Sequence, residues 1–314
     1  MDIPPDFLQR YSSLPEKERR AIVATIYTAL RQNPDATAKA ADYIEGFLEQ
    51  PKASICPIFR EHRGSMEQFG SSVLLDILGV NFLLTASHIT DLNESSSLYI
   101  PGKKHLIPIS GYLADMRMPT SGNRDDDRYD VAYYRLDHDC ISEIHDEFAF
   151  LKADDCDLYD TTSDGDCYTI IGYPSRKSET VGQSTRTELI SLTGEGVTDS
   201  RYGKSNRNIQ HHLLIQYRRN RALHYRTFKK SLVCLPEGMS GGGVFAWHKE
   251  LPNPKFVTQP KLVGIVTDYD QGNDVFIATR LNCFVRCIMK NNPELPISLA
   301  TPFAHIGPPR RRSD

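Results

Sequence analysis

The segment Leu235–Phe245, which reads LPEGMSGGGVF, constrains the fold more than any other part of the 314-residue chain. Its glycines allow positive φ angles and let another backbone segment approach closely. A serine on such a tight turn, Ser240, is expected to have an exposed hydroxyl. The backbone N–H groups of Gly238 and Ser240 can then converge on one point, which is the arrangement that holds an oxyanion during acyl transfer.

This interpretation requires two further residues, because a serine hydroxyl is a weak nucleophile without a base and an orienting carboxylate. The segment Phe82–His88 is a predicted strand that ends in small residues and a histidine. Asp130 opens the apolar segment Val131–Leu136. Taken singly, each has an ordinary structural explanation: a histidine at a strand end, a polar residue at a strand start, and a glycine-serine turn.

Taken together and in order, the segments TASH (85–88), DVAYYRL (130–136) and GMSGG (238–242) resemble the motifs of trypsin/chymotrypsin-like serine proteases. The resemblance implies that His88 is the general base, Asp130 orients it and Ser240 is the nucleophile. It also implies that the N–H groups of Gly238 and Ser240 form the oxyanion hole. The strand at 165–174 partly resembles the one that opens the second barrel in bacterial trypsin-like and high-temperature-requirement-type proteases.

The same resemblance assigns residues around the substrate. In the segment VGIVT (263–267), the hydroxyl of Thr267 is expected to bond the carboxylate of Asp130. Asp268 and Tyr269 are expected to lie along the substrate backbone. Cys234 corresponds to the floor of the specificity pocket, and Tyr269 and Phe276 to its walls. Met239 replaces the aspartate that pairs with the new N-terminus of activated animal trypsins, so that switch is not expected here.

Residues 54–290 are predicted to form the protease domain. Short β segments, one of them over 105–112, alternate there with turn signals, as in all-β barrels and sandwiches. The resemblance implies a mainly β fold: a double antiparallel barrel with six strands in each half, the first over about 54–150 and the second over about 164–281. A helix at 282–290 is expected to close the domain, with the site in the cleft between the barrels.

Both ends of the chain lie outside this resemblance. Residues 1–53 carry apolar residues at helical spacing, interrupted at Asn33–Asp35, and predict a helical hairpin. A hairpin this short cannot bury both apolar faces alone, so we expect it to brace the barrel. A second copy or a regulatory protein partner, bound through residues 1–50, is the alternative. The tail at 291–314 is rich in proline and expected to be loosely held.

Composition restricts the other functions. The net charge of −3 and the lack of any long apolar run argue against obligate nucleic-acid and membrane partners. The basic stretch from Arg218 to Lys230 is interpreted as a solvated hairpin face. The three aspartates at 125–127 lack the spacing of a calcium loop, and no C-x-x-C pair is present, so neither a metal nor another cofactor is expected.

Location follows from the N-terminus and the cysteines. The first residues are acidic and lack the apolar core of a signal peptide, and the seven cysteines are odd in number and irregularly spaced. We therefore expect free thiols and a cytoplasmic protein. The expected function is an intracellular serine endopeptidase of restricted specificity, acting on a protein or peptide. The alternative is a pseudoprotease whose cleft only binds a peptide.

Overall fold

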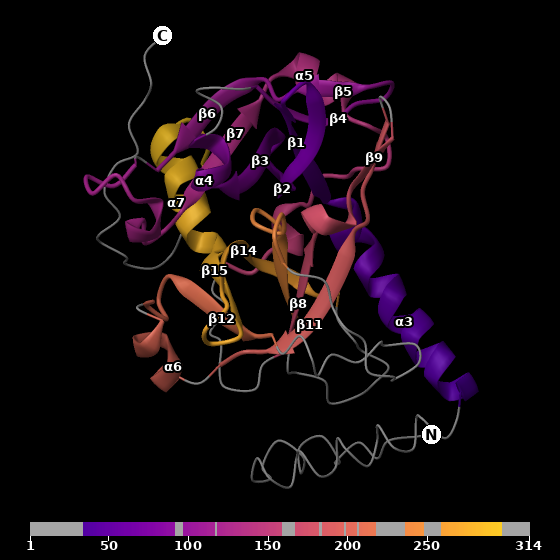
Figure 1. Ribbon diagram of the computed structural model, residues 1–314, viewed down its shortest axis with the longest axis vertical. Coiled ribbons are helices and arrows are strands. Elements are labelled where there is room, and N and C mark those ends of the chain that lie inside the picture. Colours follow the sequence, from indigo (N-terminus) through magenta and orange to yellow (C-terminus); the bar gives the residue numbers. More distant parts are fainter. Residues whose placement is uncertain are drawn as a thin grey trace, which may run out of the picture.

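The computed structural model describes residues 34–91, 97–116, 118–158, 167–181, 184–197, 199–205, 207–217, 236–247 and 259–296 (Figure 1). Several predictions from the sequence lie outside these ranges. They concern the first helix of the hairpin, the basic stretch from Arg218 to Lys230, the proposed pocket floor Cys234, and the tail beyond residue 296.

The first half of the fold is a curled antiparallel sheet of seven strands in the order β5-β4-β1-β2-β3-β7-β6. The strands are β1 (Ile55–His62), β2 (Ser65–Ile77), β3 (Val80–Ala86), β4 (Leu98–Pro101), β5 (Leu106–Pro108), β6 (Gly111–Asp115) and β7 (Val131–Leu136). Six strands were predicted. The expected strand at 105–112 is instead divided into β5 and β6, because Pro108 has no N–H to continue the ladder and Gly111 turns the chain at a φ of 127°.

The second half is an antiparallel sheet of six strands in the order β11-β8-β13-β14-β15-β12. The strands are β8 (Cys167–Gly172), β11 (Ile190–Glu195), β12 (His212–Gln216), β13 (Gly243–Trp247), β14 (Lys261–Asp270) and β15 (Val275–Arg280). A bridge between Gly196 and Ile215 joins its two edge strands, so this sheet closes into a barrel. β9 (Glu179–Val181) and β10 (Ser184–Arg186) form a separate ribbon.

A shared hydrophobic core fixes the two sheets against each other. Apolar side chains from both sheets and from the last described helix, α7 (Leu281–Asn291), form one buried cluster that includes Ile55, Val73, Phe82, Phe245, Leu262, Ile265 and Phe284. α7 turns Leu281, Phe284, Val285 and Ile288 inward at helical spacing, and so closes the fold as predicted. The mainly β architecture of two curled sheets with a C-terminal helix is therefore confirmed.

The remaining helices are short except for α3. They are α4 (Ser87–Thr90), α5 (His138–Glu143) and α6 (Asp199–Lys204), with single 3-10 turns η2 (Arg124–Asp126), η3 (Ala153–Asp155) and η4 (Ser175–Lys177). α3 (Pro34–Ala53) extends away from both sheets, as Figure 1 shows. It meets the barrels near its C-terminal end, where Leu48 is buried and the ring of Phe47 lies 6.5 Å from that of Trp247. Ile44, one turn earlier, is 43% exposed, so the contacts that the structure describes for the predicted brace lie at the end of α3.

Candidate active site

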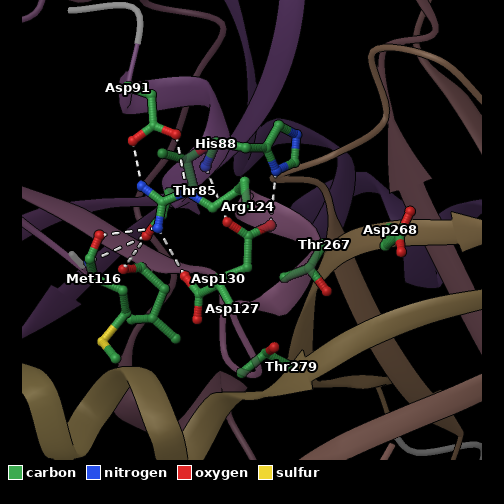
Figure 2. Close-up of polar contacts among 12 residues, drawn as sticks. Thr85, His88, Asp91, Met116, Arg124, Asp127, Asp130, Thr267, Asp268 and Thr279 are labelled. Carbon is green, nitrogen blue, oxygen red and sulfur yellow. Dashed lines mark hydrogen bonds and ion pairs between the residues drawn. The ribbon is translucent and has the colours of Figure 1, made fainter. Parts of the chain in front are cut away.

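Strand pairing brings His88 and Asp130 together. His88 lies in α4, directly after β3, and Asp130 immediately precedes β7. These strands are neighbours, with Ala86 opposite Val131. The Nδ1 atom of His88 lies 2.7 Å from Oδ2 of Asp130, and the backbone N–H of His88 donates to Oδ1 at 2.9 Å. Both carboxylate oxygens are thus engaged by one residue, which fixes the imidazole ring (Figure 2).

Neighbouring carboxylates determine the protonation of His88. Burial lowers the pKa of His88, but the hydrogen bond and charge of Asp130, with the charges of Asp268 and Asp91, outweigh it and raise the pKa. The side chains of His88 and Asp130 are 33% and 14% exposed, so solvent screens their interaction only in part. Asp130 also has a φ of 49°, a left-handed conformation that is uncommon for residues other than glycine and is found at functional sites.

The loop that carries Ser240 is held by the first sheet. The carbonyl of Ser240 accepts from the backbone N–H of Ser71 at 2.8 Å, and the carbonyl of Gly238 accepts from the Ser71 hydroxyl at 2.9 Å. Gly241 has a φ of 86°, and a Cβ atom there would lie 1.8 Å from the carbonyl oxygen of Ser71. A glycine is therefore required for β2 to approach the loop this closely.

From Gly238 to Gly241, backbone amides that donate a hydrogen bond alternate with amides that donate none to a described residue. Met239 donates to the carbonyl of Pro236 at 3.0 Å, and Gly241 donates to that of Val266 at 2.7 Å. Within the described part of the chain, the amides of Gly238 and Ser240 donate to no carbonyl. These are the two N–H groups that the sequence assigned to the oxyanion hole, and both are available to an outside acceptor.

A cleft of about 290 Å³ lies between the two sheets. It contains predicted site residues from both halves of the fold and several charged residues that were not predicted. The lining residues are His88, Arg124, Asp127, Arg128, Asp130, Arg207, His212, Ser240, Thr267 and Asp268. The structure therefore brings His88, Asp130 and Ser240 to one cleft.

No known protein family and no curated protein matches the sequence. Among solved structures, the chain is similar to neuropsin, a serine protease expressed in the limbic system of mouse brain. The TM-score is 0.51 at 12% identity, and the match covers 76% of this chain and 94% of neuropsin. The fold is that of the trypsin-like serine proteases. At this identity the likeness establishes the fold alone.

Thr267 departs from the expectation for a trypsin-like site. It lines the cleft, but its hydroxyl donates to the carbonyl of Ile277 at 3.4 Å, and the predicted hydrogen bond to Asp130 is not formed. The cause is a register shift in the β14–β15 ladder between Val266 and Asp268, which leaves Thr267 without an opposite residue. Figure 2 shows Thr267 beside the pair without a bond to it.

Tyr269 and Phe276 form an aromatic cluster with Tyr217 instead of lining this cleft. They are opposite each other in the β14–β15 ladder, and their ring centroids lie 5.4 Å apart. The ring of Tyr217 lies 5.5 Å from Tyr269 and 4.8 Å from Phe276. Phe276 is only 1% exposed, so the cluster is a filled region of the second barrel.

Arg124 was not identified from the sequence as a site residue. Arg124 is only 13% exposed and binds both carboxylate oxygens of Asp91, the residue that ends α4, with Nε to Oδ2 at 2.8 Å. Its Nη1 donates to Asp127 at 2.9 Å and to the carbonyl of Met116 at 3.1 Å (Figure 2). Arg124 thus joins the helix of His88 to the loop before Asp130. The isolated arginine before a run of aspartates, between two motif segments, was the available signal.

Two residues of the second barrel hold the segment that precedes Asp130. His212 donates through Nε2 to the carbonyl of Arg128, and the Thr279 hydroxyl donates to the carbonyl of Tyr129 at 2.6 Å. Burial lowers the pKa of His212, which favours the neutral ring. Nδ1 lies 3.1 Å from the backbone nitrogen of Asn208 and 3.0 Å from its carbonyl oxygen, so both ring nitrogens are engaged by backbone groups.

Metal and membrane sites were also considered. Among the described residues, no group of three or more His, Cys, Asp or Glu side chains is arranged to hold a metal ion. None of the described helices has the length and apolar content needed to cross a membrane.

Proposed function

We propose that this protein is a serine endopeptidase that hydrolyses peptide bonds through an acyl-enzyme. One observation supports this most strongly: the hydrogen-bonded pair of His88 and Asp130 lines one cleft with Ser240, in a trypsin-like fold. The required residue types, their chain order and their grouping in space all agree with this chemistry.

In the proposed mechanism, the Ser240 hydroxyl attacks the carbonyl carbon of the scissile bond while Nε2 of His88 takes its proton. Asp130 stabilises the imidazolium that forms. The negative charge on the carbonyl oxygen is held by the N–H groups of Gly238 and Ser240. His88 then returns the proton to the leaving amine, and water, activated by the same imidazole, hydrolyses the acyl-enzyme.

The edge of β14 can pair with an extended substrate. β13 pairs with β14 as far as Ile265, and Val266 still bonds the glycine loop. From Thr267 to Asp270, the β13-facing edge has no strand partner among the described residues. A peptide can add to this edge by antiparallel pairing, which places its carbonyl groups beside Ser240.

The pocket for the residue before the scissile bond is proposed to be shallow and uncharged. Its wall residues Tyr269 and Phe276 are packed on Tyr217, and its floor is assigned to the neutral thiol of Cys234. A cation in such a pocket would lose its hydration without a partner, at a cost of several kcal/mol. We expect small, uncharged side chains at this position.

We also propose that the enzyme acts in the cytoplasm and is regulated through residues 1–50. None of the described cysteines, which are Cys56, Cys140, Cys156, Cys167, Cys283 and Cys287, is part of a disulfide. α3 stands off the barrels with Ile44 exposed, which offers a surface to a regulatory protein. The partial resemblance of 165–174 to bacterial trypsin-like enzymes supports placing the protein near that subgroup.

The second candidate is a pseudoprotease that only binds a peptide, and the filled aromatic cluster favours it. The test is pre-steady-state hydrolysis of p-nitrophenyl acetate by the purified chain and by Ser240→Ala. A peptidase of the proposed type gives a burst of nitrophenol equal to the enzyme concentration, which is lost in the variant. A variant that retains the burst would exclude Ser240 as the nucleophile, and a wild type without one would favour the binding module.

A further inference from the structure

Arg207 has more hydrogen-bond donors than partners. Its side chain is only 16% exposed, yet its single polar contact among the described residues is Nη2 to Oδ2 of Asp268, at 3.4 Å. Nε is buried and has no partner. A guanidinium carries five N–H donors, and leaving them unpaired at this burial costs free energy. Asp268 is 54% exposed, so this ion pair is weak and another carboxylate can replace Asp268 as the partner of Arg207.

Arg128 adds a second cation to the same cleft wall. It is exposed and makes no ion pair with any residue that the structure describes. Arg124 differs from both, because Asp91 and Asp127 already satisfy its guanidinium.

The cleft's other acids are also engaged. Asp127 is bound to Arg124, and Asp130 is bound to His88. The remaining acid of the cleft lining is Asp268, whose Oδ2 lies 3.4 Å from Nη2 of Arg207. Arg207 therefore lacks acceptors for most of its donors, and Arg128, which forms no ion pair with a described residue, lines the same cleft as His88.

We propose that Arg207 and Arg128 form a carboxylate-binding subsite for an acidic side chain of the substrate, on the N-terminal side of the scissile bond. This inference rests on the proposed endopeptidase function. Asp268 lies on the β14 edge along which the substrate would pair, next to Thr267, so the bound peptide reaches Arg207 from that edge. The substrate carboxylate displaces Asp268 and gives Arg207 the bidentate partner that it lacks.

The test compares amidated peptides that differ only by glutamate or glutamine at each of the four positions before the cleaved bond. At one of these positions, kcat/KM is expected to favour glutamate by roughly tenfold or more, the effect of one charge-assisted hydrogen bond. Arg207→Met brings the Glu/Gln ratio close to one, and Arg207→Lys retains part of it. Asp268→Asn removes the competing carboxylate and raises the ratio.

Arg60→Met is the matched control. Arg60 is also largely buried, at 23% exposure, and is paired with Glu67 on the first sheet outside the cleft. Its removal leaves the Glu/Gln ratio unchanged. If Arg207 has only a structural role, the Glu/Gln ratio of kcat/KM stays at the wild-type value in both Arg207→Met and Asp268→Asn, or changes by the same factor in both.

Equal kcat/KM for glutamate and glutamine at every position, in an enzyme that cleaves peptides, would overturn the subsite and leave the proposed function standing. A preference that follows a free C-terminus instead of the glutamate would overturn the side-chain assignment. If no peptide is cleaved, calorimetry with the Ser240→Ala chain decides. Tighter, salt-sensitive binding of the glutamate peptide that depends on Arg207 supports the subsite, and equal binding contradicts it.

Discussion

At the scale of single residues, Arg124 influences the base through charge as well as position. It neutralises Asp91, whose charge acts on His88, and Asp127, which lines the same cleft as His88. Asp91 already raises the pKa of His88, even with Arg124 present. The other charged or titratable groups that face the cleft around His88 are Asp130, Arg128, Arg207, His212 and Asp268.

Arg124→Met should therefore raise the pKa of His88 further. Activity requires the neutral imidazole and is lost as the pH falls through the pKa of His88, so a higher pKa moves the acid limb of the kcat/KM profile to higher pH. The measurement is the pH profile of peptide hydrolysis. Arg124→Met combined with Asp91→Asn should move the acid limb back, because the Asp91 carboxylate that lost its partner is then also removed. An acid limb that is unchanged in Arg124→Met would contradict this account.

The outcome of the sequence predictions differs among residues for physical reasons. His88, Asp130 and Ser240 could be grouped because each lies in a local pattern of strand ends or glycines. Arg124 and Arg207 could not, because an arginine in a polar loop becomes a buried group only when the loop folds onto the barrels. The Thr267 bond was predicted wrongly because a bulge in β14 has no mark in the sequence.

At the scale of elements, the contact between β2 and the glycine loop aligns the two halves of the site. Its tightest point is Gly241, where a Cβ atom would lie 1.8 Å from the carbonyl oxygen of Ser71 and 2.4 Å from the Thr85 hydroxyl. Ser71 is paired with Pro57 in the β1–β2 ladder and Thr85 with Ala132 in the β3–β7 ladder, so neither neighbour can withdraw without breaking strand pairing.

Gly241→Ala should destabilise the protein by about 2 kcal/mol or more, because it adds left-handed strain to a steric overlap. Urea unfolding measures the change. Gly46→Ala is the matched control: a Cβ atom there meets nothing within 4 Å, and alanine in a helix should add up to about 1 kcal/mol of stability. A Gly241→Ala variant as stable as wild type would show that the loop does not rely on this contact.

The elements themselves were predicted where the pattern was local. The second sheet lies within the predicted range of about 164–281, and α7 covers the helix predicted at 282–290. The separation of β5 from β6 depends on Pro108 and Gly111 acting together, and the pattern suggested one strand. The packing of α3 depends on distant partners such as Trp247, which periodicity cannot identify.

At the scale of the whole molecule, the site exists only where the two sheets meet. The first sheet supplies His88 and Asp130, and the second supplies Ser240. Carbonyls just before Asp130 are bonded to His212 and Thr279 of the second barrel, so both halves determine its position. Met239, beside the serine, is fully buried and cannot pair with an ammonium group. The whole chain is therefore expected to be competent without cleavage to a new N-terminus.

Labelling of the uncleaved chain by a fluorophosphonate, with the adduct located by mass spectrometry, tests the central claim most directly. We predict one phosphonyl group on Ser240, absent in Ser240→Ala and His88→Ala and retained in Ser65→Ala, which changes an exposed serine at the start of β2. Labelling of another residue, undiminished labelling of Ser240→Ala, or labelling only after cleavage to a new N-terminus would contradict the account.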